Sequence, residues 1–103
     1  MPLSHADLPM FFEPRHAELA ERLLAAGDAI AAAEHAGDEP ARDRAAVAAL
    51  AAGGFFELVT RAPIDVRAIC LARELLGAVS PRADSIFAVQ GLGVHALLLA
   101  GSP

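Results

Sequence analysis

The stretch that decides the fold is ADSIFAVQGLGVHALLLAGSP, residues 83–103, which carries no Asp, Glu, Lys or Arg after Asp84. Its eight large apolar side chains are Ile86, Phe87, Val89, Leu92, Val94, Leu97, Leu98 and Leu99. At about 1.5–3 kcal/mol for each fully buried side chain, they could supply about 12–24 kcal/mol, whereas a whole domain has a net stability of about 5–15 kcal/mol. A helix that is apolar on every side must be buried on every side. Because 103 residues offer little mass to cover it, the stretch predicts a missing partner.

A membrane span is one alternative for this stretch. The run over residues 86–100 has 15 residues and carries Gln90, Gly91, Gly93 and His95, whereas a spanning helix needs about 20 residues. Arg82 stands alone before the run, so no basic flank would orient a span. We therefore expect a buried core helix over residues 82–100, and no membrane contact.

Composition restricts the class of protein. A chain of 103 residues has room for one domain, and its net charge of -5 leaves no basic stripe for a phosphate backbone, so we expect no nucleic-acid partner. The single Cys70 excludes an internal disulfide and favours a reducing compartment. The first ten residues, MPLSHADLPM, lack the basic and apolar regions of a signal peptide. The sequence is therefore typical of a cytoplasmic protein.

The hydrophobic periodicity predicts an all-α fold, a helical bundle of about four to five helices in a single domain over residues 1–103. We expect an extended or irregular segment up to Pro9 and a first long helix that opens at Glu13-Pro14-Arg15. Asp38 or Glu39 caps a second, alanine-rich helix over residues 40–52, and Gly53-Gly54 ends it. A short apolar segment over residues 55–59, a helical turn or a strand, then docks into the core, and residues 60–63 form a loop.

Asp65 is expected to cap a third long helix, which Ser80-Pro81 ends before the helix over residues 82–100. Its predicted inward side chains are Val66, Ile69, Cys70, Ala72, Leu76 and Val79. Within this pattern Cys70 is expected to be a packed core thiol rather than a nucleophile. His95, inside an apolar run, is similarly expected to be a core residue with satisfied hydrogen bonds.

Two motifs lie in the last helix. Residues 91–96, GLGVHA, match the G-x-G-x-x-G/A dinucleotide fingerprint and follow residues 86–89, which could form a strand. The context argues against this reading, because the chain ends before the βαβ unit and its later acidic residue could follow. We expect these glycines to permit the close approach of another helix or of a ligand.

The second motif is a helix face, shared by Asp84, Phe87, Ala88 and Gly91 at i, i+3, i+4 and i+7 spacing. Asp84 either marks a site on this face or simply favours the positive end of the helix dipole. The four histidines show no metal-ligand spacing, so we expect no metal site. No set of residues forms a nucleophile, a base and an oxyanion site, so no catalytic residue is assigned.

Three segments together carry a resemblance to a known family. FFEPRHAELAER over residues 11–22 resembles the opening helix of acyl-CoA dehydrogenases, and DVRAICLARE over residues 65–74 resembles that family's D-x-R-x-x-x-x-x-R-E helix. ADSIFAVQGLG over residues 83–93, followed by LLLAGS over residues 97–102, resembles the next helix and the start of its turn. The order and spacing agree over nearly the whole chain, which would correspond to most of the family's N-terminal helical domain.

The resemblance implies a flavoprotein that oxidises the Cα–Cβ bond of an acyl-CoA thioester, with FAD as the cofactor in the complete enzyme. In the family, the catalytic base and most of the FAD site lie in a middle β domain and a C-terminal helical domain, which we expect to be absent here. This chain alone would then be inactive and bind no FAD. The face formed by Asp84, Phe87, Ala88 and Gly91 would be a wall of the acyl pocket.

One segment departs from the family pattern. A Pro-x-x-Tyr-Gly-Gly-like loop usually borders the substrate site, but residues 60–64, TRAPI, are several residues shorter and contain no Gly. The resemblance implies that residues 82–100 are covered by the remaining enzyme domains. The alternative is a non-catalytic helical interaction module that oligomerises through this helix, with a self-associating copy as its partner.

Overall fold

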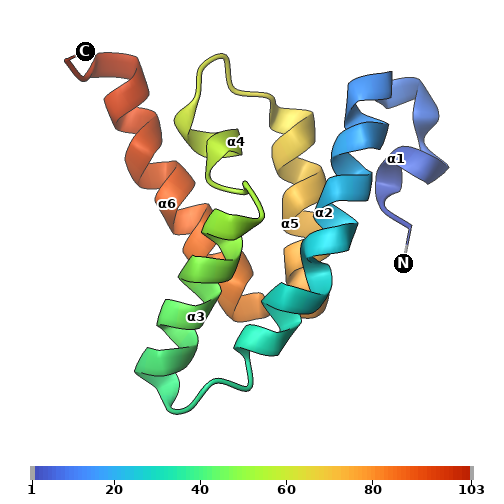
Figure 1. Cartoon of the computed structure of the whole chain (residues 1–103). Coiled ribbons are helices and arrows are strands. Elements are labelled where there is room, and N and C mark those ends of the chain that lie inside the picture. Colours follow the sequence, from blue (N-terminus) through green and yellow to red (C-terminus); the bar gives the residue numbers. More distant parts are fainter. Residues whose placement is uncertain (1, 103) are drawn as a thin grey trace.

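In residues 2–102, the part that the computed structural model describes, all regular secondary structure is helical, and turns and loops join the helices (Figure 1). The elements are α1 (Ser4–Asp7), the 3-10 turn η1 (Pro9–Phe11), α2 (Pro14–Ala33), α3 (Glu39–Ala52), α4 (Glu57–Thr60), α5 (Val66–Val79) and α6 (Pro81–Ala100). No strand occurs in these residues. The predicted all-α fold is therefore confirmed.

The predicted starts of the long helices are also confirmed, because capping side chains fix them. Asp38 accepts a hydrogen bond from the Ala41 N–H at the start of α3, and Asp65 accepts two from the first turn of α5. Ser80 caps α6 by accepting a hydrogen bond from the Ala83 N–H. Such caps satisfy amide groups that have no partner inside a helix. At the end of α3, Gly54 adopts a φ of 77°, a conformation that glycine takes without strain.

The first residues differ from the prediction of an extended or irregular segment. Residues 4–7 form α1, and Leu3, just before it, is completely buried. The Glu74 carboxylate of α5 accepts hydrogen bonds from the Ser4 N–H at 2.9 Å and from the Ser4 hydroxyl at 2.8 Å. A helix of four residues is too short to show a hydrophobic period, so the sequence pattern could not indicate it.

The helices form a flat layer rather than a sphere. The extents of the molecule are 42 × 39 × 17 Å, and α2 packs against α5 and α3, while α6 packs against α5, α3 and α4. The core between them is built from aliphatic side chains and from Phe55 and Phe87, whose rings meet edge to face with their centroids 6.2 Å apart. Phe55 and Val59 are buried, so the short apolar segment does dock into the core, as a helical turn.

The buried stripe of α5 differs from the predicted one. Val66 is 67% exposed and Cys70 is exposed, so the expectation that Cys70 is a packed core thiol is wrong. The buried residues of α5 are Ala68, Leu71, Ala72, Leu75 and Leu76. The observed stripe is centred on Leu71, Ala72 and Leu75, whereas the predicted one was rotated toward the neighbouring face.

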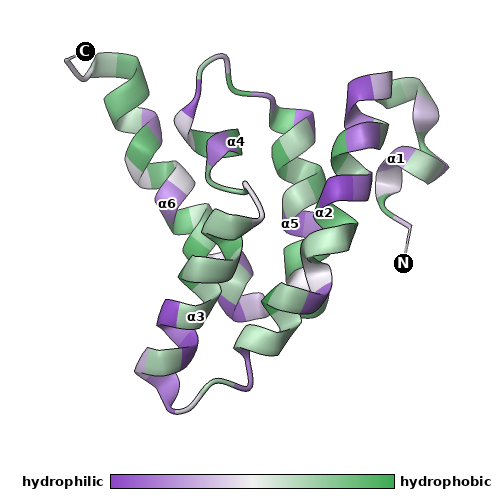
Figure 2. Cartoon of the chain, in the orientation of Figure 1, coloured by the Kyte–Doolittle hydropathy of each residue, from purple (hydrophilic) through white to green (hydrophobic). Residues whose placement is uncertain are grey.

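The expectation that α6 is a buried core helix is also wrong. Only Ala83 and Phe87 of α6 are buried, and the helix extends past α3 and α5 toward the C-terminal end of the described chain (Figure 1). Figure 2 shows that this extending part is largely hydrophobic. Both buried residues lie in the first two turns of α6, and beyond them the short α4 approaches the helix at Gly91.

By length and composition, α6 is also apolar enough to cross a membrane. The mean hydropathy of its most apolar 18-residue window is 1.5, and only 11% of that window is buried. The run over residues 86–100 is too short to span a membrane, but the helix begins at Pro81 and has 20 residues. A single helix of this kind is weak evidence for a membrane span, and the contacts of its first half argue against one, as described below.

Candidate functional site

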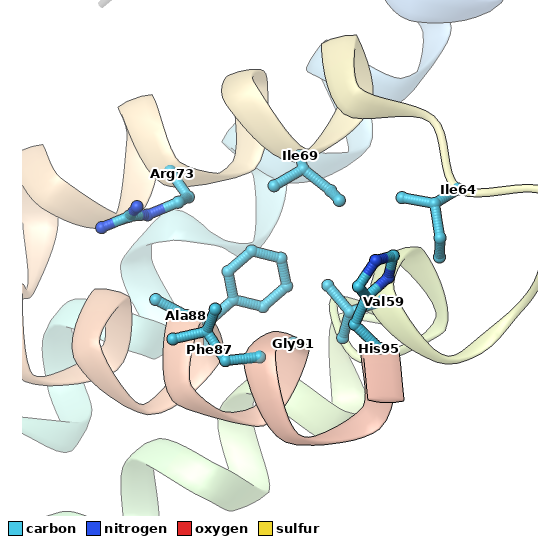
Figure 3. Close-up of a pocket in the computed structure, with 9 residues that line it drawn as sticks. Val59, Ile64, Ile69, Arg73, Phe87, Ala88, Gly91 and His95 are labelled. Carbon is cyan, nitrogen blue, oxygen red and sulfur yellow. The ribbon is translucent and has the colours of Figure 1, made fainter. Parts of the chain in front are cut away.

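A pocket of about 320 Å³ lies between α4, α5 and α6. Its α6 side is formed by Phe87, Ala88, Gly91, Leu92 and His95. The opposite side is formed by Val59 of α4, Ile64 of the loop before α5, and Ile69 and Arg73 of α5. Figure 3 shows these side chains gathered around one space, with Arg73 toward one end and Ile64 and His95 toward the other. The walls are aliphatic or aromatic except for those two nitrogen-bearing groups.

The α6 wall is placed by the anchoring of Phe87 and by the absence of a side chain at Gly91. Phe87 is completely buried and its ring lies against Phe55. A Cβ atom at Gly91 would lie 3.2 Å from a methyl carbon of Val59, which is closer than an ordinary contact. Glycine at this position therefore allows α4 to approach α6, and the pocket opens beside this contact.

The predicted face of α6 is divided between the pocket and an ion pair. Phe87, Ala88 and Gly91 line the pocket, whereas Asp84 lies one turn before it and binds Arg73. Arg73 donates from Nε and Nη2 to the two Asp84 carboxylate oxygens, at 2.9 Å each. These hydrogen bonds raise the pKa of Arg73 above its usual value. Asp84 therefore neutralises and orients the Arg73 side chain at the pocket.

Several pocket residues were not singled out from the sequence as site residues. Val59, Ile64, Ile69 and Arg73 come from segments that meet α6 only in the folded chain, although Arg73 is part of the D-x-R-x-x-x-x-x-R-E pattern. His95 was expected to be a core residue, but it is exposed, because α6 has left the core at this point. Its i, i+4 spacing from Gly91 is the signal that could have placed it on the pocket face.

A second polar cluster joins the starts of α2 and α5 and is structural. His16 is 1% exposed, and its Nδ1 accepts a hydrogen bond from the Glu13 N–H at 2.9 Å. Its Nε2 therefore carries the proton and donates to the Asp65 carboxylate, 2.8 Å away. Burial raises the pKa of Asp65, but the hydrogen bonds from His16 and from the Ala68 N–H outweigh it and leave this pKa lowered. Both imidazole nitrogens are occupied, so His16 is not available as a base.

A third cluster ties the start of α6 to α2 and α3. The Ser80 hydroxyl donates to Glu34 of α2, and Arg82 binds Glu34, Glu39 and Asp43. The hydrogen bond from Ser80 is the main cause of a lowered pKa of Glu34, and its carboxylate partners raise the pKa of Arg82. Because every charge in this cluster has a partner, it acts as a clamp between helices. Among residues 2–102, no group of three or more His, Cys, Asp or Glu side chains could hold a metal ion.

The glycines of the dinucleotide fingerprint lie inside a continuous helix. Residues 91–96 belong to α6, with helical residues on both sides. A dinucleotide loop needs a strand before the glycines and a helix that begins after them. The strand–loop–helix reading of this motif is therefore wrong for the described structure.

The pocket has the chemistry of a site for an apolar chain. Its walls would remove methylene groups from water, while the Arg73–Asp84 pair at one end and His95 at the other provide polar contacts. Among the described residues that line it, none is a carboxylate, thiol or hydroxyl that could act as a nucleophile. Comparison of the chain with models of known protein families, with curated proteins and with solved structures gave no match.

Proposed function

We propose that this chain is the N-terminal helical domain of an acyl-CoA dehydrogenase-like flavoprotein, in which α6 forms one wall of the acyl pocket. The observation that carries the proposal is the position of Phe87, Ala88 and Gly91 on the wall of an apolar pocket. The resemblance had assigned this same helix face to the acyl pocket. The resembling segments also fall on three helices, α2, α5 and α6, that pack in one bundle.

In this proposal the chain binds and orients an acyl group and does no chemistry itself. FAD, held by other domains, would supply oxidation of the Cα–Cβ bond, and a carboxylate from those domains would take the α proton. The pocket volume of about 320 Å³ lies near the lower end of the range for small-molecule sites. Ile64, at the end of the shortened loop, occupies the pocket end that the longer family loop would border.

The proposal is tested by binding of a fluorescent fatty acyl-CoA analogue to the purified chain, with Ala88→Leu as the blocking variant. Ala88 lines the pocket and a leucine there would fill part of it, so we expect binding to weaken by about tenfold or more. Ala78→Leu is the matched control, because Ala78 is exposed on the neighbouring helix α5 and does not line the pocket. We expect it to leave the affinity within about twofold.

Two results would count against the proposal. One is the absence of saturable binding by the chain, and the other is an equal effect of Ala88→Leu and Ala78→Leu, which would indicate adsorption to any apolar surface. Circular dichroism of both variants checks that the helices remain intact. A parallel assay with an electron acceptor should detect neither bound flavin nor acyl-CoA oxidation by this chain alone, and robust activity would contradict its assignment as a non-catalytic wall.

A further inference from the structure

The face of α6 that points away from the core carries its own regular apolar seam. We name this the outer seam, and its positions follow one another at spacings of three and four residues: the polar Ser85, then the apolar Val89, Leu92, Ala96 and Leu99. All five are exposed, and the exposed fractions of Val89, Leu92 and Leu99 are 67%, 77% and 74%. At 100° per residue, the outer seam lies opposite the face with the buried Ala83 and Phe87. This is the spacing with which two helices pair in a coiled coil.

The molecule also exposes more surface than its mass requires. Its accessible area is 6225 Å², whereas a compact monomer of 10.6 kDa exposes about 5,500 Å². The excess of about 700 Å² is close to the roughly 800 Å² that each partner buries in a stable protein interface. The shortest extent, 17 Å, agrees with a thin layer that has a large surface for its mass.

The chemistry of the outer seam selects its occupant. Its flanks are uncharged and mostly small, with Ala88, Gly93 and Ala100 beside it, so another helix backbone could approach closely. A helix with acidic or basic flanks would find no opposite charge there. We propose that the outer seam binds the outer seam of a second copy of this chain, in a two-fold symmetric helix pair. The pair is self-complementary, because each copy offers the same uncharged surface.

A lipid bilayer is the other apolar medium that could cover this surface, and the contacts of α6 disfavour it. Ala83 and Phe87 are completely buried in the core, and Arg73 holds Asp84 to α5. Only residues 88–100 lie beyond this anchor, and 13 residues of helix are about 20 Å long, whereas the hydrocarbon core is about 30 Å thick. A span would therefore require α6 to leave the bundle. The outer seam adjoins the acyl pocket at Leu92, which belongs to both, whereas Gly91 and His95 face the pocket and lie outside the seam.

The test is sedimentation of the purified chain over a range of concentrations, comparing Leu99→Asp with Leu97→Asp. Both leucines are exposed, at 74% and 68%, but only Leu99 belongs to the outer seam and neither lines the pocket. We expect the unmodified chain and Leu97→Asp to form dimers at micromolar concentration. We expect Leu99→Asp to raise the dissociation constant by about tenfold or more, because it places a carboxylate in each copy's half of the interface.

Three results would overturn the pairing. They are a monomer at every concentration, an equal loss of dimer in the two variants, or flotation of the chain with vesicles of neutral phosphatidylcholine. The last would assign α6 to a lipid surface. Circular dichroism checks folding, and since both leucines are exposed, neither substitution should alter the helix content.

Discussion

Replacement of Phe87 by alanine should cost about 4 kcal/mol of folding stability. Phe87 is one of the largest fully buried side chains and packs edge to face on Phe55. Truncation of a buried Phe to Ala costs about 3–5 kcal/mol, because apolar contacts are lost and a cavity remains. A domain of this size has about 5–15 kcal/mol in total. Phe87→Ala should therefore leave a markedly less stable chain, with α6 detached from α4 and α5 at a lower denaturant concentration than the unmodified chain.

The assay is urea unfolding followed by circular dichroism, at a protein concentration low enough to keep the chain monomeric. Leu97→Ala is the matched control, since Leu97 lies on the same helix and is 68% exposed. Substitutions of this exposed kind change stability by about 0.5 kcal/mol or less. If Phe87→Ala and Leu97→Ala cost the same, Phe87 does not anchor α6 in solution, and the division of α6 into an anchored and an uncovered half is wrong.

Two further predictions concern the polar clusters. His16→Ala should lower the free energy of unfolding by about 3 kcal/mol, because a buried ring is lost and a charged hydrogen bond to Asp65 is broken. Urea unfolding measures this loss. The control Asp65→Asn keeps a helix cap and an acceptor oxygen, so it should cost clearly less. Ser80→Ala should shift the pKa of Glu34 upward toward 4.5, as measured by NMR titration. Because the folded-state pKa of Glu34 is lowered, its stabilising contribution is present above pH 4.5 and is lost as the pH falls through the folded value.

The starts of the helices could be predicted from the sequence more accurately than the faces that the helices bury. The caps Asp38, Asp65 and Ser80 act locally, so the starts of three helices could be predicted from neighbouring residues. The exposure of Cys70 could not be predicted in this way, because α5 is apolar around much of its circumference and only packing decides which face turns inward. In the candidate site, too, packing between helices decides which residues meet.

Spacing alone placed Phe87, Ala88 and Gly91 on one face, and the pocket lies on that face. The opposite wall comes from α4, the loop and α5, whose residues meet α6 only through long-range packing. Arg73 is an example of a residue whose partner depends on packing. It lies on α5 and binds Asp84 on α6, and the two helices meet at Ser80-Pro81. Local patterns predict which residues share a helix face, whereas the residues that pack against that face depend on the whole fold.

The two glycines of α6, Gly91 and Gly93, allow a direct test of whether α4 packs closely against α6. Glycine to alanine inside a helix adds about 0.5–1 kcal/mol of stability where space is free. A Cβ atom at Gly93 meets nothing within 4 Å, whereas one at Gly91 lies 3.2 Å from Val59 Cγ1. Gly93→Ala should therefore stabilise the monomer by up to about 1 kcal/mol, and Gly91→Ala by clearly less, or should destabilise it, because α4 must move.

Urea unfolding of the two variants side by side measures the difference, with the helix propensity term cancelling between them. An equal gain in both would mean that α4 does not approach α6 closely and that Gly91 has no packing role. A gain confined to Gly93→Ala would show that the first glycine of the G-x-G pattern is needed for the contact between α4 and α6. That contact positions Val59 and Gly91 on facing walls of the pocket, so the same measurement reports on the geometry of the candidate site.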